Sequence, residues 1–177
     1  MKFLPTPLEG AFVVEQEPFS DDRGFFARAF CKAEFSEAGI DLDFVQMNMS
    51  GNSRAGTLRG LHYQDETAPE AKFLRCVRGR IFDAIVDMRI GSVTYGQWFG
   101  VTLTAEDRRA IFVPPLFAHG YMSLEDDSQV MYQTSAYYAP GTERGVRFDD
   151  PGVGIKWPMA PADISEKDKT WPDISLK

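Results

Sequence analysis

Near the middle of the chain, residues 73–88 read Phe73-Leu74-Arg75-Cys76-Val77-Arg78-Gly79-Arg80-Ile81-Phe82-Asp83-Ala84-Ile85-Val86-Asp87-Met88. Two runs in this segment, Phe73–Val77 and Ile81–Met88, are rich in the β-branched and aromatic residues that favour strands. The Gly-Arg pair at 79–80 is a turn signal between them. The segment therefore predicts two strands joined by a short turn.

Short runs of this kind, bounded by turn residues, recur on both sides of the segment. Further predicted strands are Ala11–Glu15, Phe25–Phe30, Phe44–Ser50, Thr57–Gln64, Gln97–Thr104, Ala110–Val113 and Gln129–Thr134. The helical signal is confined to an amphipathic stretch at Lys32–Ala38 and a turn near Ser165. Many short strands with almost no helix indicate an antiparallel sandwich or barrel. Because no repeat or linker interrupts the pattern, residues 1–177 are predicted to form one domain.

The charge of the chain argues against some classes of binding partner. The 177 residues carry a formal net charge of −7, and no basic run or face appears among them. Nucleic acid and anionic membrane surfaces are therefore not expected as partners. A small anionic ligand remains compatible with this charge, because a few well-placed arginine and lysine side chains are enough to bind one.

The first seven residues contain two prolines and lack the apolar core that a signal peptide has. No apolar stretch approaches the length of a membrane span. Cys31 and Cys76 lie in apolar, strand-like surroundings and suggest no disulfide framework. We therefore expect a cytoplasmic protein with two reduced cysteines.

Only two histidines, His62 and His119, occur in the chain. Because an unperturbed imidazole titrates near neutral pH, His62 is a candidate general base if a carboxylate holds its far nitrogen. A core histidine bonded to a backbone carbonyl is an equally good interpretation. No metal site is predicted, since two histidines far apart in the sequence, without a His-x-His or paired-cysteine motif, are few for such a site.

Strand alternation assigns some side chains to faces. Gln46, Asn48 and Ser50 share one face of a predicted strand, opposite the apolar side chains at 45, 47 and 49. A face of amides is typical of a strand that lines a ligand site, although a solvated face explains it nearly as well. The alternation alone therefore leaves both interpretations open.

Arg59 and His62 have opposite parity on their predicted strand and should point apart. Both can serve one pocket only if Gly60 interrupts the alternation as a bulge. The direction of Tyr132 is ambiguous, because one of its neighbours is apolar and the other is polar.

Asp168, Tyr132 and Lys72 are candidates for the other parts of a proton-transfer site. Asp168 could hold the far nitrogen of His62, but the phrase Ser165-Glu166-Lys167-Asp168 also reads as a capped helix start, and spacing alone favours the cap. Tyr132 could donate a proton, or it could be an ordinary strand aromatic. Lys72 could stabilise an enolate oxygen, or it could be an ordinary solvated lysine.

A series of phrases runs in order through nearly the whole chain: Asp22-Arg23-Gly24-Phe25-Phe26, Gln46-Met47-Asn48-Met49-Ser50, Leu58-Arg59-Gly60-Leu61-His62-Tyr63-Gln64, Ala71-Lys72-Phe73-Leu74-Arg75, Phe117-Ala118-His119-Gly120, Tyr137-Tyr138-Ala139-Pro140, Glu143-Arg144-Gly145 and Ser165-Glu166-Lys167-Asp168. Through these phrases the chain resembles the dTDP-4-dehydrorhamnose 3,5-epimerase family. Members of that family are cofactor-independent, cupin-like jelly rolls that act on 4-keto sugar nucleotides. The resemblance implies an all-β, antiparallel jelly-roll barrel with a few short helices, an isomerase activity and no cofactor.

The resemblance also implies roles for individual residues. His62 would be the catalytic base paired with Asp168, Tyr132 would be the acid on the other face of the sugar, and Lys72 would lie against the keto oxygen. The sugar-nucleotide site would be lined by Arg23, Gln46, Asn48, Arg59, His119, Glu143 and Lys167, with Phe19 and Tyr138 stacking on the nucleobase. The implied partners are a nucleoside-diphosphate 4-keto sugar and a second copy of the chain. Family members are homodimers that exchange amino-terminal strands, here Ala11–Glu15 and its neighbour.

Three positions depart from the family pattern. Arg28 stands where an acidic residue is usual, Glu70 replaces a common glutamine, and Met47 occupies the centre of the Gln-x-Asn phrase. If Arg28 lies near the nucleobase, its donor-only guanidinium suits a base other than thymine, or thymine held through its carbonyls. The alternative is that Arg28 turns to solvent or pairs with a nearby acid such as Asp21 or Asp22.

The sequence is compatible with four functions. The first is a 3,5-epimerase of a dTDP-4-keto-6-deoxyhexose that feeds deoxysugar and surface-polysaccharide synthesis. The second inverts C3 only, or takes a sugar on a different nucleotide. A catalytically silent sugar-nucleotide-binding jelly roll and a metal-dependent cupin are the third and the fourth.

Overall fold

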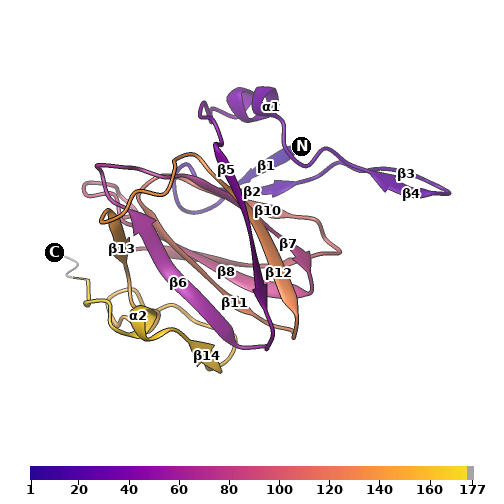
Figure 1. Cartoon of the computed structure of the whole chain (residues 1–177). Coiled ribbons are helices and arrows are strands. Elements are labelled where there is room, and N and C mark those ends of the chain that lie inside the picture. Colours follow the sequence, from indigo (N-terminus) through magenta and orange to yellow (C-terminus); the bar gives the residue numbers. More distant parts are fainter. Residues whose placement is uncertain (175–177) are drawn as a thin grey trace.

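Two largely antiparallel sheets form the body of the molecule in the computed structural model, which describes residues 1–174 (Figure 1). The first sheet has the order β1 (Lys2–Pro5), β2 (Phe12–Glu15), β10 (Ala110–Val113), β7 (Lys72–Arg78), β12 (Ser128–Thr134) and β5 (Gln46–Asn52). The second has the order β13 (Glu143–Gly145), β6 (Thr57–Gln64), β11 (Phe117–Ser123), β8 (Arg80–Asp87) and β9 (Trp98–Thr104). The short strand β14 (Asp163–Ile164) pairs in parallel with β6. The predicted all-β jelly roll is thereby confirmed.

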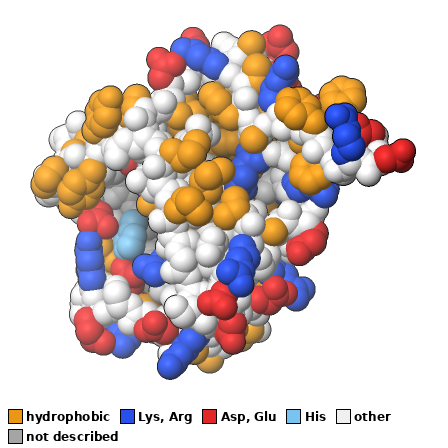
Figure 2. Space-filling view, turned by 45° about the vertical axis from the view of Figure 1, so that its right-hand side comes forward, with side chains coloured by type: hydrophobic (Ala, Val, Ile, Leu, Met, Phe, Trp, Pro, Cys, Tyr) orange, Lys and Arg blue, Asp and Glu red, His pale blue; other side chains and the backbone are white. Residues whose placement is uncertain are grey.

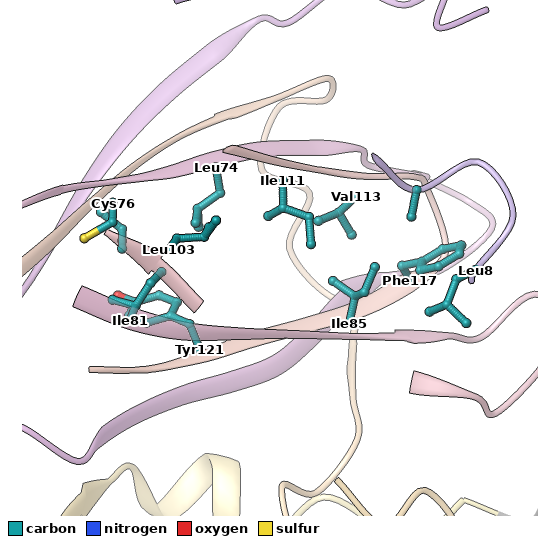
Figure 3. Close-up of a cluster of buried hydrophobic side chains, with 12 residues drawn as sticks. Leu8, Leu74, Cys76, Ile81, Ile85, Leu103, Ile111, Val113, Phe117 and Tyr121 are labelled. Atoms are coloured by element: carbon teal, nitrogen blue, oxygen red, sulfur yellow. The ribbon is translucent and has the colours of Figure 1, made fainter. Parts of the chain in front are cut away.

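The main hydrophobic core lies between the two sheets. Leu74 and Ile111 project from the first sheet toward Ile81, Ile85 and other apolar side chains of the second (Figure 3). Ile81 and Ile85 lie four residues apart on β8 and therefore on the same face of the strand, as the two-residue period of a β-strand requires. Each is fully buried, and burial of a side chain of this size contributes about 1.5–3 kcal/mol. This core holds the two sheets together.

The outer faces of the sheets are covered only in part. Helix α1 (Lys32–Glu37) lies on the first sheet, where the ring of Phe35 packs with its centroid 4.9 Å from that of Phe73. The chain after β13 covers the second sheet and ends in the short helix α2 (Glu166–Lys169). No helix among residues 1–174 is long and apolar enough to cross a membrane.

Two apolar surfaces are left uncovered. Val45, Met47 and Met49 form an outer patch on and beside the edge strand β5, and the side chain of Met49 is 67% exposed. The hairpin of β3 (Phe19–Asp21) and β4 (Gly24–Phe26) projects away from the body (Figure 1). Hydrophobic side chains gather on the face of the molecule that carries the hairpin (Figure 2). Exposed apolar surface of this extent is typical of an interaction site.

Most predicted elements are present, with small shifts at their ends. Thr57–Gln64 and Ala110–Val113 agree at both ends, and the predicted helix at Lys32–Ala38 ends one residue earlier. The predicted strand Phe25–Phe30 is wrong beyond Phe26, because Phe30 packs instead in the aromatic cluster under α1. Strand β11 was not predicted, because all seven of its residues are buried and no polar–apolar alternation marks it.

Strand β6 is irregular at Gly60. The pairing of β6 with β11 shifts register between His119 and Tyr121, and Gly60 has a φ of +121°. A Cβ atom at Gly60 would lie 2.5 Å from the Cα atom of Gly120. Arg59 and His62 both line one cavity. The predicted interruption of the strand alternation at Gly60 allows both side chains to point to this side.

We expect Gly60→Ala to cost roughly 1–3 kcal/mol more unfolding free energy than Gly91→Ala, because only the first adds overpacking to an unfavourable φ. Gly91 has a φ of +88°, and a Cβ atom there would meet nothing within 4 Å. Urea denaturation of both variants measures the difference. Equal losses would contradict the assignment of a steric constraint to Gly60.

Candidate active site

A cavity of about 470 Å³ opens between the two sheets and the carboxyl-terminal segment. It is lined by residues of β5, β6, β7, β11, β12, β14 and α2: Ser50, Thr57, Leu58, Arg59, His62, Lys72, Leu74, His119, Tyr121, Tyr132, Asp163, Ile164, Ser165, Lys167 and Asp168. A second hollow of about 270 Å³ shares His62, Lys72 and Tyr132 with it. The four predicted catalytic residues therefore lie around one site.

The imidazole of His62 is tied to α2 by Asp168. His62 Nε2 lies 2.6 Å from Asp168 Oδ1, and the backbone N–H of Gly60 donates to Asp168 Oδ2 at 3.2 Å. Ser165 caps α2 by accepting a hydrogen bond from the backbone N–H of Asp168 at 3.1 Å. Both interpretations of this phrase are therefore correct: Ser165 is the cap, and the Asp168 carboxylate holds the histidine.

Asp168 is a buried carboxylate, with only 4% of its surface exposed. Burial by itself raises the pKa of the Asp168 carboxyl, but its hydrogen bond with His62, the charge of His62 and the Gly60 N–H together hold that pKa below its ordinary value. With Nε2–H directed at this carboxylate, Nδ1 is the ring nitrogen that carries the free lone pair. In this orientation, Nδ1 of His62 is available to accept a proton.

Tyr132 and Lys72 face His62 from the first sheet. Burial is the main cause that raises the pKa of the Tyr132 hydroxyl, and the charge of Glu70 adds to it, while Arg59 lowers it. The phenol is therefore held in its proton-donating form. Lys72 Nζ donates to the backbone carbonyl of His62 at 3.3 Å and lies 3.4 Å from Glu70 Oε1.

Basic side chains line the same cavity. The Arg59 guanidinium is fixed by Nε donating to Asn52 Oδ1 at 2.9 Å and by Nη2 donating to the Gly51 carbonyl at 3.2 Å. His119 is buried, and its Nε2 lies 2.8 Å from Asp83 Oδ2. Together with Lys72 and Lys167 these groups give the cavity a wall suited to an anionic ligand.

The face of β5 that carries the predicted amide side chains lines the second hollow. Gln46 and Asn48 line it together with Tyr138 and Glu143, while the apolar side chains on the other face of β5 turn outward. Gln46 Oε1 accepts a hydrogen bond from the backbone N–H of Tyr138 at 2.9 Å. Glu143 forms an ion pair with Lys167, and its Oε1 atom lies 3.9 Å from His62 Nδ1. The interpretation of β5 as a lining strand is the one that fits.

Three predicted site residues lie apart from this cavity within the single chain. Phe19 and Arg23 belong to the projecting β3–β4 hairpin, where Arg23 Nε donates to Asp21 Oδ2 at 3.1 Å. Arg28 is exposed and donates to Glu34 Oε1 at 2.6 Å, so its acidic partner is neither Asp21 nor Asp22. The chain alone does not bring these three side chains to the other site residues.

Other residues of the site were not singled out from the sequence. The Tyr121 hydroxyl donates to Ser50 Oγ at 2.9 Å, and Trp171 packs against His62 with ring centroids 6.2 Å apart. Tyr121 lies two residues after His119 and therefore on the same face of a strand, which could have identified it. The sequence does not identify Asp83, whose carboxylate holds His119, as a site residue, because its neighbours on the same face of β8 are core isoleucines.

The arrangement provides a base and an acid on opposite walls of one cavity, with a cation beside them. His62 comes from the second sheet, and Tyr132 and Lys72 come from the first. Such a site can remove a proton next to a carbonyl group, stabilise the resulting oxyanion and return a proton from the other side. Among residues 1–174, no group of three or more His, Cys, Asp or Glu side chains is placed to hold a metal ion.

The chain is similar to known proteins over nearly its whole length. Residues 5–175 match the family model described as dTDP-4-dehydrorhamnose 3,5-epimerase. A dTDP-4-dehydrorhamnose 3,5-epimerase of Methanothermobacter thermautotrophicus is 46% identical, over 96% of this chain and 92% of that protein. The crystal structure of the Bacillus anthracis enzyme of the same name, with TDP and PPi bound, has a TM-score of 0.94 and 37% identity, over 98% and 99% of the two chains. A 3'-monoepimerase from Streptomyces bikiniensis, in complex with dTDP-quinovose, has a TM-score of 0.87 and 37% identity, over 96% and 86%.

We expect Asp168→Asn to lower the unfolding free energy by about 1–3 kcal/mol at pH 7 and by less at pH 3. Because the pKa of Asp168 is lowered in the folded state, its ionised form stabilises the fold above its ordinary pKa, and this contribution is lost as the pH falls through the lowered value. Glu166→Gln, on the exposed side of α2, is the control and should show no such dependence on pH. Denaturant titrations at both pH values test this, and a loss that is equal at pH 7 and pH 3 would contradict it.

Proposed function

Because the chain belongs to the dTDP-4-dehydrorhamnose 3,5-epimerase family, we propose that it inverts C3 and C5 of a nucleotide-linked 4-keto-6-deoxyhexose. The observation that carries this proposal is the placement of the His62–Asp168 pair and Tyr132 on opposite walls of one cavity. The reaction is an isomerisation and moves only protons, so we expect it to need no cofactor. A cytoplasmic location remains a prediction from the sequence.

His62 is the proposed base. The 4-keto group acidifies the hydrogens at C3 and C5, because the carbanion formed by their removal is an enolate. Abstraction by His62 converts its ring to an imidazolium, which the Asp168 carboxylate stabilises at 2.6 Å. The ammonium of Lys72 lies 3.3 Å from the His62 backbone carbonyl and lines the same cavity, where it is the proposed contact of the enolate oxygen. A single contact of that kind contributes about 3–4 kcal/mol in other enzymes.

Tyr132 is the proposed acid. Inversion requires that the proton return to the face opposite the one from which it was taken, and Tyr132 stands on the opposite wall from His62. Its raised pKa keeps the phenol protonated until the enolate forms. The resulting tyrosinate and the imidazolium then return to their starting states by exchange with solvent.

The remaining cavity residues are the proposed substrate contacts. Arg59 is held by Asn52 and the backbone of β5 with its guanidinium at the cavity, which suits a diphosphate. Gln46, Asn48 and Glu143 offer polar contacts to the sugar nucleotide in the adjoining hollow, and Tyr138 offers an exposed ring for the base. The similarity to dTDP-sugar epimerases favours a thymidine nucleotide. The ion pair of Arg28 with Glu34 gives no support to selection of another base by Arg28.

Inversion at C3 alone is a second candidate, because a 3'-monoepimerase shares this fold with a TM-score of 0.87. Both reactions use the same base, acid and oxyanion contact. They differ in which carbon lies between His62 and Tyr132, and that depends on how the sugar is seated.

We also propose that the functional unit is a homodimer. Strand β2 is paired on both sides within its own chain, by β1 and β10, so we assign the exchanged segment to the projecting β3–β4 hairpin in place of Ala11–Glu15. That hairpin exposes Phe19 to 78% and Phe26 to 74%. A second copy that packs on these rings and on the outer patch would bury them and would bring its own Phe19 and Arg23 toward the hollow near Tyr138.

Incubation with nucleotide 4-keto sugars in D₂O tests the reaction. We expect wild-type protein to incorporate deuterium at C3 and C5, and His62→Ala to reduce this exchange by roughly 10²–10⁴-fold because the base is lost. Tyr132→Phe should keep exchange but lose net inversion, and Tyr137→Phe is the exposed control. NMR of the sugar reads both quantities. Deuterium at C3 alone would favour the monoepimerase, and near-normal exchange in a folded His62→Ala protein would refute the assignment of the base.

Light scattering should give wild-type protein a mass near twice the 19.9 kDa of one chain. If Arg23 acts across the dimer, an equal mixture of Arg23→Ala and His62→Ala chains should regain about a quarter of wild-type activity, because half of the dimers are mixed and each has one intact site. Neither variant alone should do so. A monomeric protein, or no recovery after confirmed subunit exchange, would contradict the proposal.

A further inference from the structure

Glu70 is a further carboxylate at the site, besides Asp163, Asp168 and Glu143. Its side chain is only 10% exposed, in the turn before β7, and it lines the hollow that contains His62, Lys72 and Tyr132. Asp168 is engaged by His62, and Glu143 is engaged by Lys167. Glu70 has its ion pair with Lys72, at 3.4 Å, so its charge lies beside the groups proposed to handle the enolate and the returning proton.

Lys72 is held from two sides. Its ammonium donates to the backbone carbonyl of His62 at 3.3 Å and faces Glu70 Oε1. A lysine side chain has many rotamers, and an ion pair with a nearly buried carboxylate restricts them. Among residues 1–174, Glu70 is the ion-pair partner that the structure gives Lys72, so removal of the Glu70 charge would leave the ammonium with neutral acceptors.

Tyr132 is surrounded by groups of both signs. The titratable groups that line the two hollows with it are Glu70 before β7, Lys72 on β7, Arg59, His62 and Tyr63 on β6, Tyr121 and His119 on β11, Tyr138 after β12, Glu143 on β13, Asp163 on β14, and Lys167 and Asp168 at α2, whereas β5 supplies only the uncharged Gln46, Asn48 and Ser50. Asp168 is hydrogen-bonded to His62 and Glu143 forms an ion pair with Lys167, both on the side of the site opposite Tyr132. Glu70 is the acidic group whose charge acts on the Tyr132 hydroxyl.

We propose that Glu70 is a positioning residue that fixes the Lys72 ammonium toward the substrate and keeps Tyr132 in its phenol form until the enolate is reprotonated. This inference rests on the proposed function, because it takes Tyr132 as the acid. Ionisation of Tyr132 would place a second anion in a partly buried hollow beside Glu70, and like charges in such a place repel strongly. Burial and then Glu70 are the leading causes that raise the pKa of Tyr132.

The role of Glu70 has a kinetic signature. Net inversion falls at high pH when the Tyr132 phenol ionises, and we call the pH of this fall the alkaline limit. If the charge of Glu70 protects the phenol, the alkaline limit depends on Glu70, whereas proton abstraction by His62 does not. In Glu70→Gln the alkaline limit for inversion moves to lower pH, and between the new limit and the old one exchange continues while inversion falls. A purely structural role for Glu70 would lower exchange and inversion together at every pH.

The direct test is the titration of Tyr132 by NMR of ¹³C-labelled tyrosine, with the signal assigned by its loss in Tyr132→Phe. In Glu70→Gln, which keeps the size of the side chain, Tyr132 is expected to titrate at lower pH than in the wild type. Glu70→Asp keeps the charge and should stay close to the wild type. Glu143→Gln removes another carboxylate from the same hollow and should leave the Tyr132 titration in place.

An unchanged Tyr132 titration in a folded Glu70→Gln protein would overturn the inference, as would an equal shift in Glu143→Gln. Because this measurement needs no substrate, its failure leaves the proposed epimerase untouched. Failure of wild-type protein to exchange deuterium into any 4-keto sugar would instead overturn the proposed function. A normal alkaline limit for inversion in Glu70→Gln, despite a shifted Tyr132 titration, would overturn the catalytic part of the inference alone.

Discussion

The close approach of the Gly60 and Gly120 backbones is the constraint on which the site depends. A Cβ atom on Gly60 would lie 2.5 Å from the Cα atom of Gly120, and one on Gly120 would lie 2.8 Å from the Arg59 carbonyl oxygen. Only two glycines allow β6 and β11 to meet in this way. The resulting shift in register turns Arg59 and His62 to one side of β6 and leaves the Gly60 N–H free to bind Asp168. The placement of the proposed base, of its carboxylate and of the arginine proposed to bind the anion therefore follows from one local irregularity.

The jelly roll lets single strands serve both the core and the site. On β7, Lys72 and Leu74 share a face, and on β12 so do Val130 and Tyr132. Leu74 and Val130 belong to the apolar core, while Lys72 and Tyr132 reach the cavity, which Leu74 also lines. Because the two sheets face each other, side chains from β6 and β12 converge from opposite walls without any long loop. Rigid strands hold an acid and a base more firmly in place than mobile loops could.

Local patterns predict the strands but not the pairing of the site residues. Thr57–Gln64 is identified by its β-type residues, whereas β11 escapes because burial on both faces removes the alternation. His62 and Asp168 are 106 residues apart in sequence, and no local rule joins them. The phrase at Ser165 predicts a helix cap, and only the tertiary structure shows that the carboxylate of the same turn reaches the histidine. Family phrases identified the set, and the fold accounts for its geometry.

The charges of the site explain how an acidic chain can bind an anionic ligand. The net charge of −7 is spread over the whole molecule, and salt screens exposed charges beyond about 10 Å. Within the cavity, Arg59 and Lys167 lie close to any ligand, and Asp168 and Glu143 are already engaged by His62 and Lys167. A carboxylate with a cationic partner, as Glu143 has in Lys167, repels an incoming phosphate less than a free one does. The surroundings also differ between the proposed base and the proposed acid: a carboxylate lies beside His62, and burial on the opposite wall raises the pKa of the Tyr132 phenol.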